Sequence, residues 1–570
     1  MRKSEFAVFG ACPGRPLSTI TVVHGWSKRV NAASGKSGIL QSAMTTRSSK
    51  ACRPVRETSA RLVAWVGLGI LVAWFLLQGL VRRPDQIVDD LGGWRGADTQ
   101  TIARYFWRDG IDVLFPRIAW GGNGPGYVES ELQLVPALIA LVMHLVGYAE
   151  WPGQLLSMLS MVLAYLVLFG NLRRRFGPWP ALFAVTLLLS AKGTVNISTS
   201  VQPDPLAFLF FVVAWDAFSR HVEAPSHRTL VVACAATTIA GLVKPTMLAL
   251  GVAQFVLVWL SARALFKRPA LWLTWATTVL VVGAYLYHAR NLYLTYGNTF
   301  GILSGGDAKT PHLRHLIDPR LWQEALKNNV ILGTGFPAVL AGLWLALRRR
   351  IHAIEWSLLA GNLAMIVVAF RYACNYYWGA HYHLVAIPLA AHVLAHAFDD
   401  LAQRFAPQRR GWAWIGGTVA VLSSLQYARA VYRIRTQPAE PEALLGRRLA
   451  STASPGDLIV VRARSFSYDE EWNTANNFQD PRLFYLSDTR GWVVANDQPE
   501  SNSVQQYARL GAKYYVEPFD KWHSYPKVAE WLRSHARLAM DSHEGSIWKL
   551  QPHVDGGLVG RQGEAADEND

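Results

Sequence analysis

Residues 62–81 read LVAWVGLGILVAWFLLQGLV, twenty consecutive residues without a charged side chain. As a helix rising 1.5 Å per residue, this run spans about 30 Å, the thickness of the hydrocarbon core of a bilayer. Similar runs recur to about residue 427, at 155–172, 230–243, 271–287, 330–347 and 354–370. The pattern predicts an α-helical polytopic membrane protein with about eleven to thirteen transmembrane helices.

The charged residues of the chain are distributed in step with the apolar runs. Its 56 Lys and Arg exceed its 40 Asp and Glu, giving a formal net charge of +16. The basic residues cluster in short links between apolar runs, at 173–175, 267–268, 348–350 and 409–410. Because cytoplasmic loops of membrane proteins carry this bias, we expect the lipid bilayer as a partner and no nucleic acid.

Placing the basic links in the cytoplasm assigns the remaining connections to the opposite face of the membrane. These are the long first loop, 82–131, and the segments 201–205, 243–246, 288–336 and 371–383. The alternation of sides holds only if residues 132–146 form a re-entrant or juxtamembrane helix rather than a full crossing.

Four regions are expected along the chain. Residues 1–60 form a disordered cytoplasmic N-terminus, and 1–43 lack an apolar signal core, so Met44 is an alternative start. Residues 61–432 form the membrane domain, 433–552 a small extracytoplasmic α/β domain, and 553–570 a disordered acidic tail. The α/β domain has strand-like segments at 458–462, 483–486, 513–516 and 547–550 and helix-like segments at 442–451, 503–510 and 527–534, without a catalytic motif.

The loop 82–131 is too long for a simple connection, which is typical of functional loops. It carries an amphipathic piece at 99–107, which argues against disorder, and several acidic residues. Its glycine-rich stretch, 121–126, lacks the Lys and Ser or Thr of a phosphate loop. These glycines therefore favour a tight turn.

Ionisable side chains at the membrane boundary are costly unless they serve the interior of the protein. Asp98, Glu131 and Asp204 each lie near the start of a helical segment, where a helix cap or a complement to the helix dipole is the structural alternative to a catalytic or binding role. Lys244 stands alone between two apolar runs, so it either snorkels to the interface or binds an anion.

Further candidates lie on the same predicted face. Arg290 and Arg371 end apolar runs where the positive-inside rule does not predict arginine, and a guanidinium suits phosphate recognition. His381, Tyr382 and His383 follow an aromatic cluster of the kind found in interfacial belts. The two histidines could ligate a divalent metal, although the sequence offers no evident third ligand.

Six motifs follow one another along the chain: Ala97-Asp98 with 102–104, Glu131 with Pro136, the basic link 173–177, Pro203-Asp204, the Lys-Pro turn 242–245 and the segment 381–388. In this order, they resemble the GT-C membrane glycosyltransferases, specifically bacterial relatives of protein O-mannosyltransferases and aminoarabinose transferases (glycosyltransferase family 39-like). The sequence departs from the pattern at Thr99, where many relatives have a second acidic residue, and at 130–133, which lack paired prolines.

The resemblance implies an inverting hexosyl- or pentosyltransferase of the bacterial inner membrane. It would move a sugar from a polyprenyl-phosphate donor to a hydroxyl of an exoplasmic acceptor, which could be a lipid, a glycan or a protein. A transporter or flippase of a lipid-linked or anionic solute is the alternative, although such proteins often show paired halves and this chain shows none.

Each candidate then has an expected role. The catalytic residues are Asp98, as general base, and Glu131. The donor phosphate is held by Lys244, Arg290 and Arg371. Substrate-binding residues are Asp204, His381, Tyr382 and His383.

Overall fold

The computed structural model describes residues 53–89, 93–304, 316–328, 335–369, 380–405, 409–470, 474–497, 501–519 and 525–551. The expectations for residues 1–52 with Met44, for Arg371 and for the acidic tail lie outside these ranges. Residues from Ala60 onward form one unit, and the description below concerns that unit.

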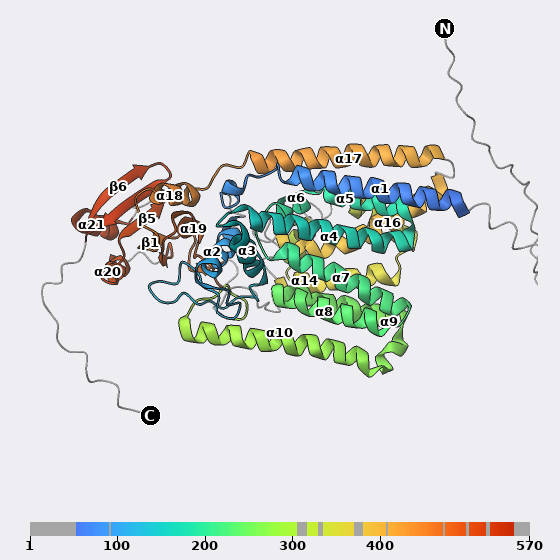
Figure 1. The fold of residues 1–570 in the computed structure, drawn as a ribbon, viewed down its shortest axis with the longest axis horizontal. Coiled ribbons are helices and arrows are strands. Elements are labelled where there is room, and N and C mark those ends of the chain that lie inside the picture. Colours follow the sequence, from blue (N-terminus) through green and yellow to red (C-terminus); the bar gives the residue numbers. More distant parts are fainter. Residues whose placement is uncertain are drawn as a thin grey trace, which may run out of the picture. The chain divides into compact units, whose positions relative to one another are not determined.

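The described chain as far as residue 435 is mostly helical, and its helices pack side by side (Figure 1). Two short 3-10 helices also matter for the site, η3 (Pro245–Ala249) and η6 (Ala380–Val385). The α-helices are α1 (Arg53–Gln78), α2 (Trp94–Asp109), α3 (Leu134–Val146), α4 (Trp151–Phe176), α5 (Pro178–Leu189), α6 (Lys192–Ser198), α7 (Asp204–Glu223), α8 (His227–Val243), α9 (Leu250–Ser261), α10 (Pro269–Tyr296), α12 (Pro319–Asn328), α13 (Phe336–Leu347), α14 (Ala353–Ala369), α16 (Ala386–Phe405) and α17 (Arg409–Arg435).

Four of the described helical segments are long and apolar enough to cross a membrane: α4, α7, α10 and His381–Arg404. The pair α5 and α6, bent by 68°, would be a fifth, and six shorter apolar helices of 10–17 residues lie beside them. A polytopic helical membrane fold is thus confirmed, while the number of eleven to thirteen spans stays a prediction. The 13 residues of α3 span only about 20 Å, which is less than the thickness of the hydrocarbon core of a bilayer. A re-entrant or juxtamembrane helix, as expected at this position, has such a length.

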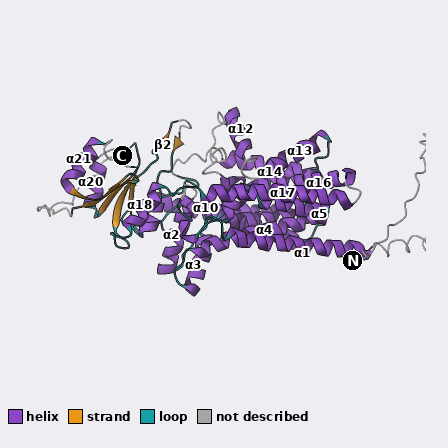
Figure 2. Cartoon of the chain, turned by 90° about the horizontal axis from the view of Figure 1, so that it is seen from above, coloured by secondary structure: helices purple, strands orange, loops and turns teal. Residues whose placement is uncertain are grey.

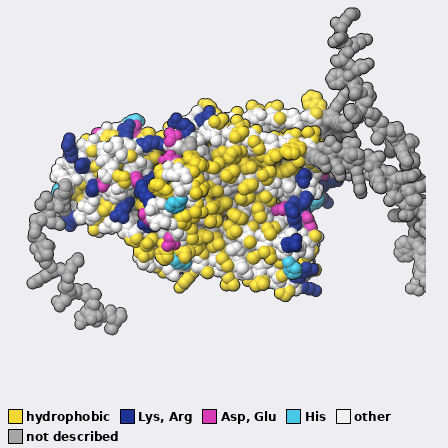
Figure 3. Space-filling view, in the orientation of Figure 1, with side chains coloured by type: hydrophobic (Ala, Val, Ile, Leu, Met, Phe, Trp, Pro, Cys, Tyr) yellow, Lys and Arg dark blue, Asp and Glu magenta, His cyan; other side chains and the backbone are white. Residues whose placement is uncertain are grey.

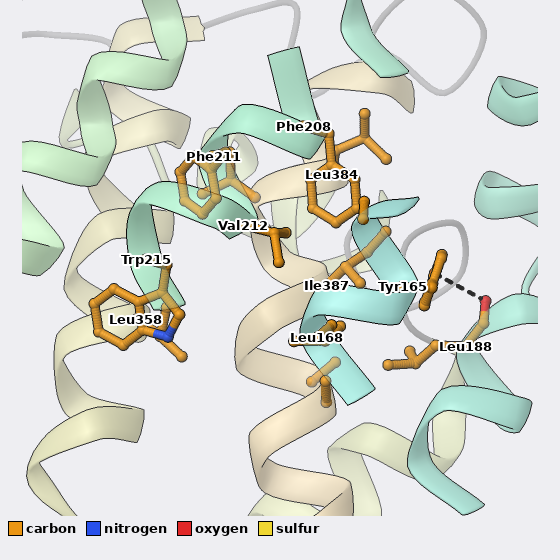
Figure 4. Packing of buried hydrophobic residues seen from close by; sticks show 14 of the residues in the cluster. Tyr165, Leu168, Leu188, Phe208, Phe211, Val212, Trp215, Leu358, Leu384 and Ile387 are labelled. Carbon is orange, nitrogen blue, oxygen red and sulfur yellow. Dashed lines mark hydrogen bonds between the residues drawn. The ribbon is translucent and has the colours of Figure 1, made fainter. Parts of the chain in front are cut away.

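The core of the helical part centres on α7. Phe208, Phe211 and Trp215 are fully buried and project from α7 toward its neighbours (Figure 4). Tyr165 of α4 is equally buried, and its hydroxyl donates a hydrogen bond to the Leu188 carbonyl of α5 at 3.3 Å. Side chains of α4, α5, α7, α14 and α16 therefore fix one another, which gives the surrounding elements a rigid support.

The outer surface of the same helices is apolar. On α10, Leu273, Val279 and Leu280 are 67%, 63% and 70% exposed. Figure 3 shows hydrophobic side chains over this part of the surface, with Lys and Arg gathered at its two ends. An exposed apolar surface this extensive is the surface that a bilayer covers.

The C-terminal region forms a five-stranded sheet with order β4-β1-β5-β7-β6 (Figure 2). β1 pairs in parallel with β4 and β5, whereas β7 pairs antiparallel with β5 and β6. A separate two-stranded ribbon is formed by β2 (Tyr468–Asp469) and β3 (Thr474–Ala475). The other elements are α18 (Pro441–Leu449), β1 (Leu458–Arg462), α19 (Arg482–Ser487), β4 (Arg490–Val494), α20 (Ser501–Arg509), β5 (Tyr514–Pro518), α21 (Pro526–His535), β6 (Ala536–Ser542) and β7 (Gly545–Leu550).

Three of the four predicted strands and all three predicted helices of this domain are confirmed. The strand predicted at 483–486 is wrong, because these residues belong to α19. A short apolar run does not distinguish a buried strand from a buried helical turn, and here the strand is the next segment, β4.

The long first loop joins the helical part to the C-terminal domain. The Gly122 amide donates to the Gly491 carbonyl at 2.7 Å, and the Gly491 amide donates to the Ala119 carbonyl at 2.9 Å. Arg104 of α2 donates to Asp488 at 2.8 Å, and its guanidinium lies over the Tyr485 ring. The loop and the edge of the sheet are thus held together by backbone and side-chain bonds.

The glycine stretch has the expected role in chain geometry. Gly122 and Gly126 have φ values of 78° and 74°, which side chains rarely allow. A Cβ on Gly126 would lie 2.6 Å from the Ile118 carbonyl oxygen. The tight turn predicted here is confirmed.

Candidate active site

A cavity of about 800 Å³ lies where the first loop, the ends of several helices and the C-terminal domain meet. Its walls combine apolar side chains with both signs of charge. The charged residues that line it are Arg82, Arg95, Asp98, Glu131, Lys244, Glu442, Arg464, Asp480 and Arg482.

Asp98 projects from α2 into this cavity. Its side chain is 3% exposed, and its Oδ1 accepts a hydrogen bond from Trp120 Nε1 at 3.0 Å. The helix begins at Trp94, so Asp98 lies in the second turn and is not a cap. Burial raises the pKa of Asp98 to about 7, although Arg95 and the Trp120 hydrogen bond oppose the shift. A carboxyl with this pKa exchanges a proton near neutral pH.

Glu131 lies before α3 and forms an ion pair with Arg95, one turn before Asp98 on α2. Burial alone would raise the pKa of Glu131, but Arg95 and Lys244 outweigh it and hold that pKa at about 2. The Arg95 guanidinium also lies 4.2 Å from the centre of the Phe300 ring. Glu131 therefore stays ionised and fixes Arg95 at the cavity wall. Sequence reasoning missed Arg95, which has no motif of its own.

Lys244 follows α8 and precedes Pro245, which ends the helix and turns the chain into η3. Its side chain is buried, so it does not snorkel to an exposed interface. Its Nζ lies 3.6 Å from Asp204 Oδ1 and 5.1 Å from the centre of the Tyr382 ring. Asp204 is the first residue of α7 and is fully buried. The predicted Lys244, Asp204 and Tyr382 are thus in contact.

The other predicted residues divide between the cavity and its surroundings. His381 lines the cavity beside Tyr382, and their ring centres are 4.2 Å apart. His383 is buried but is not among the lining residues, and neither is Arg290, which is exposed on α10. Arg371 lies outside the described residues. Their predicted roles stay predictions.

A metal at this cavity would need converging ligands. Within the described ranges, the one group of three His, Cys, Asp or Glu ligand atoms that lie within 4.8 Å of one another is elsewhere, at His352, Glu355 and His396. His381 and His383 therefore do not form part of such a group.

The C-terminal domain supplies one wall of the cavity, which the sequence did not indicate. Arg482 of α19 is fully buried and donates to Asp480 at 2.6 Å through Nη2, which also lies 3.3 Å from Glu442 Oε2. Burial, with Asp480 nearby, raises the pKa of Glu442. With Arg464, the domain thus brings two acidic residues and two arginines to the cavity that holds Asp98.

Comparisons with known proteins agree with this architecture. Residues 133–288 match the model of the dolichyl-phosphate-mannose-protein mannosyltransferase family. No curated protein sequence matches the chain. Among solved structures, ArnT from Cupriavidus metallidurans in the apo state is similar at a TM-score of 0.56 and 15% identity, with 88% of this chain and 99% of ArnT covered.

The same ArnT bound to undecaprenyl phosphate gives a TM-score of 0.54 at 15% identity, with 87% of this chain and 99% of that chain covered. The fold of this protein is thus the GT-C fold, and the resemblance stated from the sequence is confirmed.

Proposed function

We propose that this GT-C protein is an inverting glycosyltransferase that moves a sugar from a polyprenyl-phosphate donor to a hydroxyl group of an acceptor. One observation carries the proposal. A buried carboxyl that titrates near neutral pH, Asp98, shares a cavity with two buried or half-buried cations, Arg95 and Lys244. Undecaprenyl phosphate, which ArnT binds, has the chemistry that such cations would recognise.

The reaction follows from these groups. The acceptor oxygen attacks the anomeric carbon while Asp98 accepts its proton, and the bond from that carbon to the phosphate oxygen breaks. The phosphate leaves with the electron pair, and Lys244 and Arg95 offset the negative charge that develops on it. Attack opposite the leaving group inverts the anomeric configuration.

Glu131 has a supporting role in this scheme. It was predicted as a catalytic residue, yet a carboxylate with a pKa of about 2 is a poor proton acceptor. Its ion pair keeps Arg95 pointing along the cavity wall. In the same way, the ion pair with Asp204 holds the Lys244 ammonium group at the cavity. Both acids therefore position the cations that bind the donor.

The acceptor would reach the cavity between the membrane part and the C-terminal domain, because that domain contributes Glu442, Arg464, Asp480 and Arg482 to its wall. The basic links, such as Arg174 and Arg350, lie on other helix ends, away from this cavity. If these basic links face the cytoplasm of a bacterium, as the positive-inside rule favours, the cavity and the domain would lie on the extracytoplasmic face of the inner membrane.

The test is transfer of a radiolabelled sugar. Purified protein in vesicles is given a labelled polyprenyl-phosphate sugar and bacterial envelope fractions as acceptors, and both labelled product and released polyprenyl phosphate are measured. We expect both from the wild type and neither from Asp98→Asn. Movement of intact donor between leaflets, without cleavage, would instead establish a flippase and refute the proposal.

A further inference from the structure

A second polar cavity, of about 760 Å³, lies in the helical part, separate from the one that holds Asp98. Its lining includes six residues of types that can ligate metals, beside Arg174 and Arg175: Glu223, His352, Glu355, His392, His396 and Asp399. His396 lies on α16, fifteen residues after His381 of η6, which lines the first cavity. At about 1.5 to 2 Å per residue this places the two sites roughly 20 to 30 Å apart along these helices.

Three of these residues converge. The ligand atoms of His352, Glu355 and His396 all lie within 4.8 Å of one another. His396 Nδ1 is 3.1 Å from Glu355 Oε1, and the His352 and His396 ring centres are 4.4 Å apart. Glu355 is 2% exposed and His396 6%, whereas His352 is exposed. Glu355 and His396 are therefore held in place by burial, whereas the exposed His352 side chain can rotate.

The geometry of the helices explains this convergence. His352 immediately precedes α14, and Glu355 is in the first turn of that helix. The His352 backbone amide donates to Glu355 Oε2 at 3.0 Å, which turns the carboxylate back toward the chain entering the helix. α16 crosses beside α14 and presents His392 and His396, four residues apart, on one face.

A fourth residue shows that the site is not complete. His392 is fully buried, lines the same cavity, and has no hydrogen-bond partner at either ring nitrogen. Buried polar groups are nearly always satisfied, so two unsatisfied nitrogens beside a His-Glu-His group indicate a missing ligand. Phe176 covers the group from one side, with its ring 5.4 Å from His396 and 5.9 Å from His392.

We infer that His352, Glu355 and His396 bind a zinc ion that joins the start of α14 to α16. Two imidazoles and one carboxylate form a ligand set that suits Zn²⁺, and a water molecule in the cavity that His392 also lines can take the fourth position. Ligand atoms around zinc lie about 3.3 Å apart, which the exposed His352 side chain reaches by rotating inward. The site is independent of the sugar transfer proposed above.

The inference is tested by zinc binding to the full chain, purified without a histidine tag in detergent. After equilibrium dialysis against Zn²⁺, elemental analysis should find one tightly bound zinc per wild-type chain. His352→Ala should weaken binding at least tenfold, and His396→Ala should abolish it. His227→Ala, at an exposed histidine that begins α8, is the matched control and should retain the zinc.

A spectroscopic readout separates this site from adventitious binding. Co²⁺ in place of zinc should give the intense visible absorption of a tetrahedral site in the wild type and in His227→Ala, and lose it in His352→Ala. Because His352 is exposed, its substitution leaves the buried helix contacts intact, so the test stands even if His396→Ala does not fold. Equal zinc binding by the wild type and His352→Ala, or no tight zinc in the wild type, would overturn the inference.

Discussion

Replacing Asp98 with asparagine isolates the proton transfer from every other property of the cavity. The amide is nearly isosteric, and its oxygen can still accept the 3.0 Å hydrogen bond from Trp120. It cannot accept the acceptor's proton. Loss of a general base lowers kcat by about 10² to 10⁴, or about 2.7 to 5.4 kcal/mol in activation free energy at 1.36 kcal/mol per tenfold.

The assay compares initial rates of labelled sugar transfer by the two proteins at matched amounts in vesicles. We expect kcat to fall by this factor while the donor KM changes less than about threefold, because Asp98 does not hold the phosphate. Asp112→Asn is the control, since Asp112 is exposed in the same loop and its side chain accepts a hydrogen bond from the Leu114 amide, which an asparagine oxygen can also accept. Activity of Asp98→Asn close to that of the wild type would refute the assignment of Asp98 as the base.

The pH dependence tests the same residue without relying on the amount of residual activity. Because burial raises the pKa of Asp98 to about 7, its reactive carboxylate form is lost as pH falls through that value. The wild-type kcat/KM should therefore rise with pH through about 7. The free energy of unfolding changes with pH in the opposite direction. Because its pKa is raised, the Asp98 carboxyl binds a proton more tightly in the folded state than in the unfolded state. The free energy of unfolding therefore falls as the pH rises from about 4 to the folded pKa of about 7.

Asp98→Asn should remove this decrease and be no less stable than the wild type at pH 8, as read by thermal unfolding. A wild-type rate profile that is flat from roughly pH 5.5 to 8.5 would show that another group takes the proton.

Three further substitutions test the contact with the donor phosphate, the attachment of the C-terminal domain and the acceptor side of the cavity. Lys244→Ala removes a charge-assisted contact of about 1.5 to 3 kcal/mol with the donor phosphate, so the donor KM should rise about ten- to a hundredfold; an unchanged KM would leave Lys244 as only the partner of Asp204. Arg104→Ala should loosen the C-terminal domain and lower the melting temperature, whereas Arg83→Ala, at an exposed arginine, should not. Glu442→Gln should alter the acceptor KM but not the donor KM, as measured by varying each substrate in turn.

The sequence predicted the membrane fold because long uncharged runs have few alternative structures. It also singled out Lys244, Asp204 and Tyr382, because a charge or an aromatic group at the end of an apolar run is conspicuous, and the structure shows that these three side chains are in contact. In contrast, Arg95 stands in a loop with many charges, and only the fold shows that it meets Glu131, 36 residues away.

Where the sequence did not show which residues share the cavity, the physical reason is the same. Arg290 stands at the end of an apolar run as Lys244 does, but it is exposed on α10 and does not line the cavity, so its predicted role stays a prediction. The C-terminal residues Asp480 and Arg482 carried no motif, because their role depends on α19 lying beside α2. Local pattern fixes which residues reach the membrane boundary, and only tertiary packing decides which of them share a cavity.

The backbone hydrogen bonds that join Gly122 and Ala119 to Gly491 hold the C-terminal domain where it can influence the proton transfer proposed for Asp98. Asp480 belongs to that domain, and its negative charge is one of the causes that raise the Asp98 pKa. Truncating the chain before α18 would admit water to Asp98 and remove this charge. The carboxyl would become more acidic and a weaker base, so a truncated protein that still inserts and folds would turn over slowly and lose its sensitivity to neutral pH.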